Sequence, residues 1–127
     1  MGSPIHHNPD PVPATVGGYS QGVETRGARR LFVSGQIPED ASGRVPEGFE
    51  AQCELAWTNL LEVLKSAGMG ASDLVKVTTF LTHPDQARVN SEIRRRILGD
   101  ARPALTVMVA QTLDSRWLLE IEAVATA

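Results

Sequence analysis

Two carboxylates near the carboxyl end of the chain have the spacing best suited to acid–base chemistry. In the segment Leu119-Glu120-Ile121-Glu122-Ala123, charged and apolar residues alternate. In a β-strand successive side chains point to opposite faces, so Glu120 and Glu122 share one face, opposite Ile121 and Ala123. This pattern leaves two interpretations open. Either both acids lie in water on a half-exposed strand, or one of them lines a cleft between subunits and exchanges protons with a water molecule.

The other residue types that carry chemistry do not form a site by their spacing. His6 and His7 lie in a polar segment and His83 stands alone, so we expect no metal site. Cys53 is the single cysteine and cannot form an internal disulfide. Because it falls among apolar residues at helical spacing, we expect a buried thiol rather than a nucleophile. The basic run Arg94-Arg95-Arg96 is interpreted as a solvated helix face.

Length and composition are typical of one globular unit. The chain has 127 residues, of which 42% are hydrophobic, and a formal net charge of −3. This charge argues against a nucleic-acid-binding surface, which usually has a basic footprint. No apolar run reaches the roughly 18 residues that cross a bilayer, and the polar, proline-rich start does not resemble a secretory signal. We therefore predict a cytoplasmic protein with no membrane partner. Its single domain spans residues 1–127, in which 1–11 form an extended arm and Met1–Ser3 are interpreted as a remnant of expression.

Hydrophobic periodicity predicts two helices. Apolar residues recur at three- and four-residue intervals from Phe49 to Leu64, with polar residues between them, and Gly68 is suited to end this helix. A second helix is expected to open at residues 82–85, to carry an apolar stripe of Val89, Ile93 and Ile97, and to close at Gly99.

Several strands are expected around these helices. A hairpin is predicted from residues 19–24 and 31–34, followed by strands at 74–81, 104–110 and 117–124. The order β-β-α-β-α-β-β predicts an α+β fold, a mixed sheet of about five or six strands with both helices on one face. The other face of so small a sheet would be bare, so we expect other subunits to cover it.

Five segments in the same order resemble the RidA/YjgF family of reactive-intermediate deaminases. The resemblance spans about residues 12–126, nearly the whole chain. The segments that carry it are Gly17-Gly18-Tyr19-Ser20-Gln21-Gly22-Val23, Phe32-Val33-Ser34-Gly35-Gln36-Ile37-Pro38, Val75-Lys76-Val77-Thr78-Thr79-Phe80-Leu81, Val89-Asn90, and Arg102-Pro103-Ala104 followed by Glu120-Ile121-Glu122-Ala123-Val124-Ala125.

The resemblance implies a chorismate-mutase-like fold and a homotrimer with three clefts between subunits. Members of the family hydrolyse imines and enamines to carbonyl compounds and ammonia, and they use no cofactor. By position, Tyr19 would line the cleft, Ser34 and Gly35 would form its floor, and Asn90 would shape its wall. Glu120 would be the catalytic residue and position the attacking water.

One departure from the family pattern bears on the substrate. Active members usually continue Pro-Ala with an arginine that holds the substrate carboxylate, whereas here Pro103-Ala104 is followed by Leu105 and Thr106. Both residues are predicted to lie in the substrate site. The loss of one charge-assisted contact, about 1.5–3 kcal/mol, weakens carboxylate recognition by roughly 10- to 150-fold. Whether Arg30 or Arg116 takes over this contact is left open.

Two functions from different classes follow. The first is hydrolytic deamination of an imine or enamine other than the simple 2-amino acid derivatives, which retained Glu120 favours. The alternative is a non-catalytic trimer that binds a small metabolite, which Leu105 favours. The ribonuclease activity often attached to this family by name lacks support here, since there is no basic stripe with interleaved aromatic residues.

Overall fold

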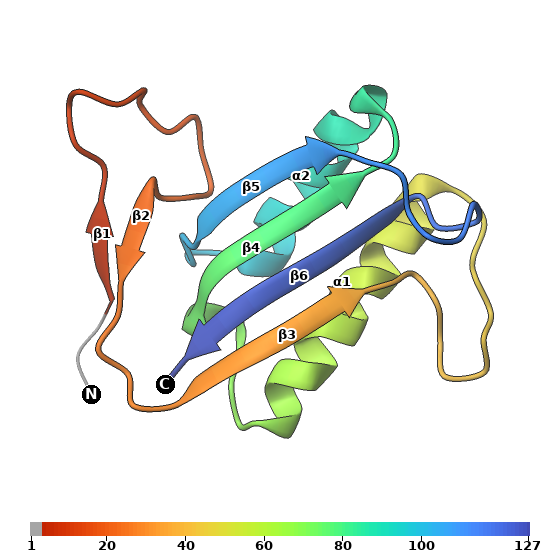
Figure 1. The fold of residues 1–127 in the computed structure, drawn as a ribbon, viewed down its shortest axis with the longest axis horizontal. Helices are drawn as coiled ribbons and strands as arrows, with labels where there is room; N and C mark the ends of the chain where they lie inside the picture. The colour runs from red at the N-terminus through yellow and green to blue at the C-terminus, as the bar shows by residue number, and fades with distance from the viewer. Residues whose placement is uncertain (1–3) are drawn as a thin grey trace.

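The computed structural model describes residues 4–127 as strands and helices that follow one another along the chain (Figure 1). Met1–Ser3, the predicted expression remnant, lie outside the described residues. The elements are β1 (Ile5–His7), β2 (Gly22–Glu24), β3 (Arg30–Gln36), α1 (Phe49–Ser66), β4 (Leu74–Leu81), α2 (Ala87–Leu98), β5 (Ala104–Val109) and β6 (Leu119–Thr126). Short 3-10 turns precede β4 and α2.

The main sheet has four strands in the order β3-β6-β4-β5. Strand β4 precedes α2 in the chain and β5 follows it, and the two strands pair in parallel. Strand β6 pairs antiparallel with both β3 and β4. The remaining strands, β1 and β2, form a separate antiparallel ribbon that meets the main sheet through a bridge between Ser20 and Ala104. The α+β class is confirmed, but the strands divide into two sheets.

The predicted hairpin of residues 19–24 with 31–34 is wrong. Strand β2 pairs with β1, and β3 pairs with β6. The arm therefore contributes a strand of its own, which apolar alternation could not indicate because all of β1 is exposed. Backbone pairing and two polar contacts hold it instead: His6 Nδ1 lies 2.7 Å from Ser20 Oγ, and His7 Nε2 lies 3.0 Å from Glu24 Oε1.

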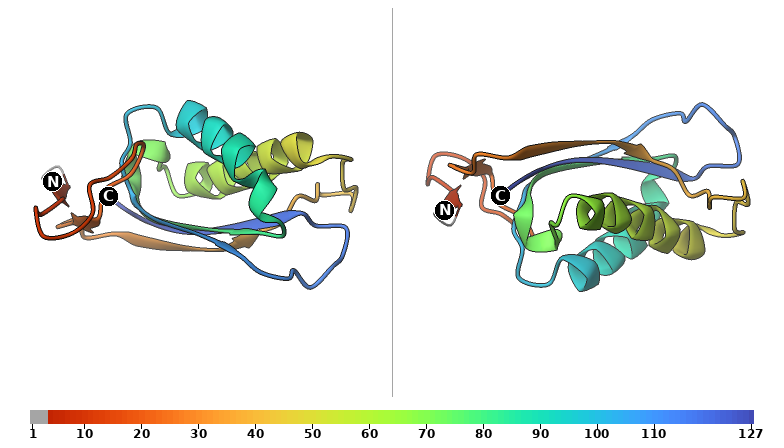
Figure 2. Two further views of the ribbon diagram at one scale, coloured as in Figure 1. Left: turned by 90° about the horizontal axis from the view of Figure 1, so that it is seen from above. Right: turned by 90° about the horizontal axis from the view of Figure 1, so that it is seen from below.

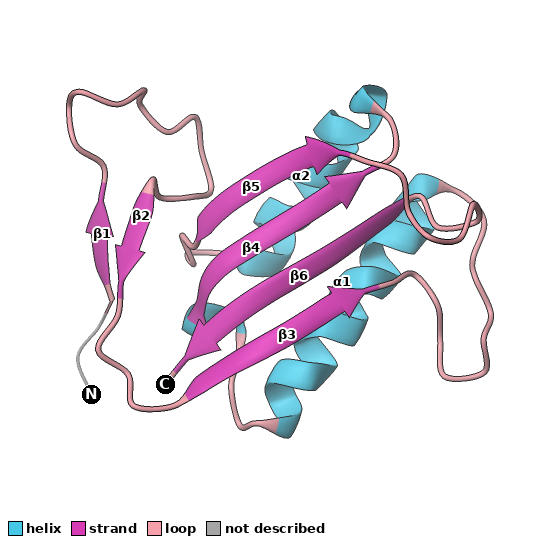
Figure 3. Cartoon of the chain, in the orientation of Figure 1, coloured by secondary structure: helices cyan, strands magenta, loops and turns pink. Residues whose placement is uncertain are grey.

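Both helices pack on one face of the main sheet, as predicted, and the other face is bare within the described chain (Figure 2). Helix α1 buries Cys53, Ala56, Trp57, Leu60 and Leu64 completely against the sheet. Long loops at 37–48 and 110–118 gather at one end of the sheet (Figure 3), where Trp117 Nε1 donates to Glu39 Oε2 at 3.2 Å. None of the helices within residues 4–127 has the length and apolar character needed to cross a membrane.

The buried face of α2 differs from the predicted stripe. Its buried residues are Asn90, Ile93, Arg94 and Leu98, while Val89 and Ile97 lie half-buried at its edge. Arg94, four residues after Asn90, is turned inward by the helical repeat. The prediction that the whole basic run is solvated is therefore wrong for Arg94, which is 4% exposed, although Arg95 and Arg96 are exposed.

Candidate functional site

The carboxylate of Glu120 lies directly over Gly35, on the face of the sheet that the helices leave bare. Leu119 and Ile121 are buried on the helix side, so Glu120 and Glu122 point to the bare face, as alternation predicts. A Cβ built on Gly35 would overlap Glu120 Oε2 and lie 2.8 Å from its Cδ. Glycine at position 35 therefore leaves the space that the Glu120 carboxylate occupies. The structure therefore brings the predicted catalytic residue and one predicted floor residue into contact.

A bulge in β3 shapes the backbone beneath this carboxylate. Val33 pairs with Ala123 and Gln36 pairs with Ile121, so two residues of β3 stand opposite the single residue Glu122 of β6. The two residues of the bulge are Ser34 and Gly35. Ser34 is exposed, and its carbonyl accepts a hydrogen bond from Gln36 Nε2 at 2.9 Å. Bulges often re-aim side chains next to functional sites, and this one lies at the predicted floor of the cleft.

Glu120 takes no part in the ion pairs found among residues 4–127. Among residues 4–127 the ion pairs involve Glu24, Glu54, Glu92 and Asp114. Glu120 is half-buried and pairs through its backbone with Phe80 of β4. Glu122 of the same face is also outside these ion pairs, but it lies near Lys76, whereas Glu120 is the carboxylate seated against Gly35 at the β3 bulge.

Leu105 and Thr106 lie on opposite faces of β5. Leu105 pairs with the buried Val77 and packs against the hydrophobic core on the helix side. Thr106 points to the bare face, where its Oγ1 accepts a hydrogen bond from Lys76 Nζ at 2.7 Å. The pKa of Lys76 is lowered because burial disfavours its charge, and the nearby Glu122 carboxylate opposes this shift only in part. Because the two neighbours diverge, they cannot line the same wall of a cleft within one protomer.

Tyr19 follows a glycine turn that packs against α2. Gly17 and Gly18 both have positive φ and contact the side chain of Arg95, whose Nη2 donates to the carbonyl of Val16 at 3.2 Å. After Tyr19, the backbone N–H of Ser20 donates to the carbonyl of Pro103 at 3.1 Å. Tyr19 is thereby held between α2 and the start of β5, close to Leu105 in the sheet.

Asn90 is buried between the two helices rather than exposed. It is 1% exposed, and its Oδ1 lies 3.8 Å from Cys53 Sγ, within reach of a weak S–H donor. Cys53 is a free, buried thiol as predicted, and burial raises its pKa to about 12. Asn90 can influence a cleft only through the packing of α2, so its role in the wall stays a prediction.

Five of the seven predicted site residues form two groups, which Asn90 and Thr106 do not join. Ser34, Gly35 and Glu120 lie together on the bare face of β3 and β6, whereas Tyr19 and Leu105 lie at the helix side of β5. The sheet itself separates them, with β6 and β4 lying between β3 and β5. One protomer does not bring the two groups together.

Neither arginine proposed as a replacement cation lies free beside Glu120. Arg30 precedes Gly35 by five residues on β3, or about 16 Å along the strand. Arg116 is paired with Asp114, with Nη2 2.7 Å from Oδ2, and this contact holds the pKa of Asp114 at about 2. Within residues 4–127, no group of three or more His, Cys, Asp or Glu side chains is arranged to hold a metal ion.

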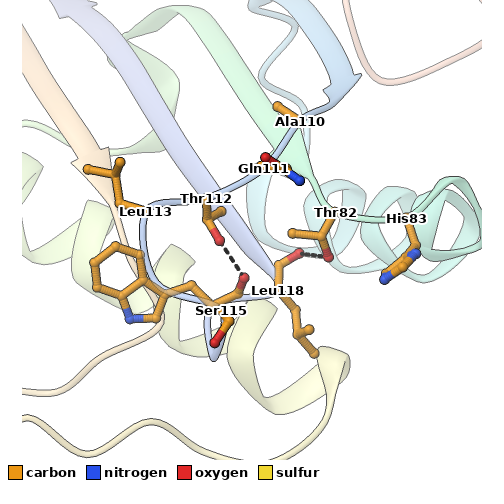
Figure 4. Close-up of a pocket in the computed structure, with 9 residues that line it drawn as sticks. Thr82, His83, Ala110, Gln111, Thr112, Leu113, Ser115 and Leu118 are labelled. Atoms are coloured by element: carbon orange, nitrogen blue, oxygen red, sulfur yellow. Dashed lines mark hydrogen bonds between the residues drawn. The ribbon is translucent and has the colours of Figure 1, made fainter.

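A cavity of about 470 Å³ lies where β4 and β5 end, between Thr82 and the 110–118 loop (Figure 4). Hydroxyl groups shape it: Thr82 Oγ1 donates to the Leu118 carbonyl at 3.0 Å, and Thr112 Oγ1 donates to the Trp117 carbonyl at 2.9 Å. The fully exposed Leu113 stands at its rim. None of the predicted site residues lines this cavity, and its one ionisable lining residue is the exposed His83.

Comparison with known proteins gives concordant results. A family model described as Endoribonuclease L-PSP matches residues 10–127. Protein DfrA of Myxococcus xanthus is 38% identical over 119 residues, covering 91% of this chain and 90% of that protein. The 2-iminobutanoate/2-iminopropanoate deaminase of Bos taurus is 33% identical over 116 residues, covering 90% of this chain and 83% of that enzyme. The crystal structure of YyfB, a Rid family protein of Yersinia pestis, is similar with a TM-score of 0.89 at 28% identity, covering 99% of this chain and 100% of that one.

Proposed function

This chain belongs to the RidA/YjgF family, and from that premise we propose that it is a hydrolytic deaminase of reactive imines or enamines, which it converts to a carbonyl compound and ammonia. The observation that carries the proposal is the Glu120 carboxylate seated over Gly35 at the β3 bulge. Leu105, in place of the carboxylate-binding arginine, gives the protein a substrate preference different from that of arginine-bearing members.

The proposed site lies between two copies of the chain. Glu120, Ser34 and Gly35 form one wall, and Tyr19 and Leu105 of a second copy form the other. This arrangement is supported by the sheet that separates the two groups within one protomer. The bare sheet face also carries apolar side chains, with Phe32 72% exposed and Met108 47% exposed. Burial of such side chains favours association, and we propose a homotrimer.

The proposed chemistry needs only water and one proton-transferring group. An enamine first gains a proton at carbon and loses one from nitrogen, which gives the imine. Water then adds to the carbon of the C=N bond while Glu120 accepts a proton from it, and the nitrogen gains a proton, which gives a carbinolamine. The hydroxyl proton of the carbinolamine then passes to the nitrogen as the C–N bond breaks, which forms the carbonyl group and releases ammonia. Imine and water thus become a carbonyl compound and ammonia, and no cofactor enters the balance.

The proposal is tested with 2-aminoacrylate generated in place, with pyruvate and ammonia release as the readout. We expect turnover well below that of family members that carry the arginine, because Leu105 cannot donate to the carboxylate. Glu120→Gln should lower the remaining rate by about 10²- to 10⁴-fold. Full turnover by the wild type would contradict the altered preference, and a rate unchanged by Glu120→Gln would contradict the catalytic role.

A non-catalytic trimer that binds a small metabolite is the second candidate. It is favoured by the packing of Leu105 against the hydrophobic core, which leaves an apolar group where an arginine would hold a substrate. The two candidates differ in one measurement. A binding protein retains its affinity for ligands in the Glu120→Gln variant and shows no Glu120-dependent turnover of any imine tested.

A further inference from the structure

Arg94 is a buried guanidinium with almost none of its hydrogen-bonding capacity used. It lies on the inner face of α2 and is 4% exposed. Its one hydrogen bond within residues 4–127 is a long contact of 3.4 Å from Nη2 to Ser91 Oγ, and its Nε has no partner. A guanidinium carries five N–H donors. Its Nε is buried without a partner, and the described chain offers the whole group only the long contact to Ser91.

The charge of Arg94 is also uncompensated within the described part of the chain. The ion pairs there engage other arginines, namely Arg26, Arg88, Arg96 and Arg116. Burial and the neighbouring Arg95 lower the pKa of Arg94, and the groups that oppose this shift are Tyr19 and Cys53, not a carboxylate. Buried charges in proteins are normally paired. An unpaired one beside a predicted binding residue indicates that an anion completes the site.

The position of Arg94 matches the wall on which the family arginine is missing. A Cβ on Gly18 would lie 3.8 Å from Arg94 Nη2, and Tyr19, the next residue, is close enough to influence its pKa. The same segment bonds through Ser20 to Pro103, two residues before Leu105. Arg94 therefore lies at the corner where Tyr19 and the start of β5 meet.

A ligand can approach this corner along β5. Leu105, Val107 and Val109 share the helix side of the strand, and beyond Leu105 the helices no longer cover it. Val107 is 39% exposed and Val109 is 50% exposed. At its Ala104 end this apolar strip adjoins the segment of Gly18, Tyr19 and Ser20 that lies against Arg94.

We propose that Arg94 binds a carboxylate of the ligand and thereby replaces the arginine that is absent at position 105. The inference rests on the proposed function, because it uses the wall assigned there to Tyr19 and Leu105. Arg94 is rooted on α2, one layer behind β5, and so it holds a carboxylate at a different place from an arginine on the strand. The ligand is then an anion whose carboxylate is set apart from the reacting carbon, unlike that of 2-aminoacrylate.

The test is a calorimetric comparison of two keto acids with their uncharged amides. Pyruvate carries its carboxylate next to the carbonyl carbon, and levulinate carries it two methylenes away; pyruvamide and levulinamide have the same shapes without the charge. The wild type should bind levulinate at least 10-fold more tightly than levulinamide, within the 10- to 150-fold range of one charge-assisted contact. The preference for pyruvate over pyruvamide should be smaller.

Arg94→Met should abolish the preference for the acid while it leaves the affinity for the amide within about three-fold. Arg94→Lys should retain part of the preference because it keeps the charge. Arg96→Met is the matched control, since it removes an exposed arginine of the same helix turn. The melting temperature of Arg94→Met, compared with that of the wild type, shows whether Arg94 binds ligand or supports the fold. Exchange of an unpaired buried charge for an apolar side chain leaves the melting temperature unchanged or raises it, whereas loss of a structural contact lowers it.

Two results would overturn the inference: a wild type that binds neither acid more tightly than its amide, and an Arg94→Met variant that is folded and keeps the preference. The proposed catalysis stands or falls separately. If the preference depends on Arg94 but no imine shows Glu120-dependent turnover, the enzymatic proposal fails and the carboxylate site remains. If turnover depends on Glu120 but the preference for the acid over the amide is the same without Arg94, only the present inference fails.

Discussion

Replacing Gly35 by alanine displaces the Glu120 carboxylate without removing it. The new Cβ would overlap Glu120 Oε2 and lie 2.8 Å from Cδ and 3.1 Å from Cγ. All three atoms belong to one flexible side chain, and none belongs to the backbone. Gly35 is also absent from the glycines with positive φ, so alanine can adopt its backbone conformation. The variant should therefore keep its fold while Glu120 rotates away from the bulge.

This rotation affects stability and rate to very different extents. A side chain pushed from its preferred rotamer costs about 0.5–1.5 kcal/mol. A glycine-to-alanine change at a compatible position stabilises by about 0.4–1 kcal/mol through the unfolded chain. The free energy of unfolding should thus change by less than about 1 kcal/mol. Loss of a positioned acid–base group lowers the rate by about 10²- to 10⁴-fold, or about 2.7–5.4 kcal/mol in the activation free energy.

The assay compares steady-state imine hydrolysis by wild type, Gly35→Ala, Glu120→Gln and the double variant, with denaturant unfolding of each. The double variant should be no slower than Glu120→Gln, because both changes remove the same group. Gly70→Ala is the matched control, since a Cβ there meets nothing within 4 Å. Wild-type turnover in a folded Gly35→Ala variant would refute the reasoning, because it would mean that the place of the Glu120 carboxylate does not matter.

Further outcomes are expected from the same structure. Sedimentation equilibrium should give a trimer mass, and Phe32→Glu should weaken the assembly because it places a charge on the bare sheet face; a monomeric wild type would contradict this. Leu105→Arg should tighten binding of pyruvate relative to pyruvamide by roughly 10-fold or more, and should lower the melting temperature without ligand, since residue 105 is half-buried; a folded variant with neither change would show that residue 105 does not face the ligand. Cys53, whose pKa is raised by burial to about 12, contributes stability that is present below the unfolded value near 9 and is lost as the pH rises towards 12. Cys53→Ala should flatten stability over that alkaline range, and an equal alkaline loss in the variant would assign it to other groups.

Local pattern alone was enough for the elements whose side chains alternate or recur strongly. The β-branched run Leu74–Leu81 is a strand with the predicted bounds. Alternation along β6 placed Glu120 on the face opposite Ile121 because the two-residue period of a strand is a local property. The burial of Cys53 followed likewise from the helical repeat of α1. In each case, the neighbours in the chain contain the information.

Pairing partners and packing decided the rest. The bulge at Ser34 and Gly35 exists only because β3 is aligned with β6, almost ninety residues later, and no local pattern marks it. The β1–β2 ribbon is held by backbone bonds that any exposed sequence can form. Arg94 is buried because Ile93 and Asn90 set which side of α2 meets the sheet, and a run of three arginines predicts the opposite. The parallel register of β4 with β5 turned Leu105 to the helix side and Thr106 to the bare face. Side-chain type and spacing determine which residues can share a face, but only the packed sheet decides which face is covered, because burial depends on contacts between segments far apart in the chain.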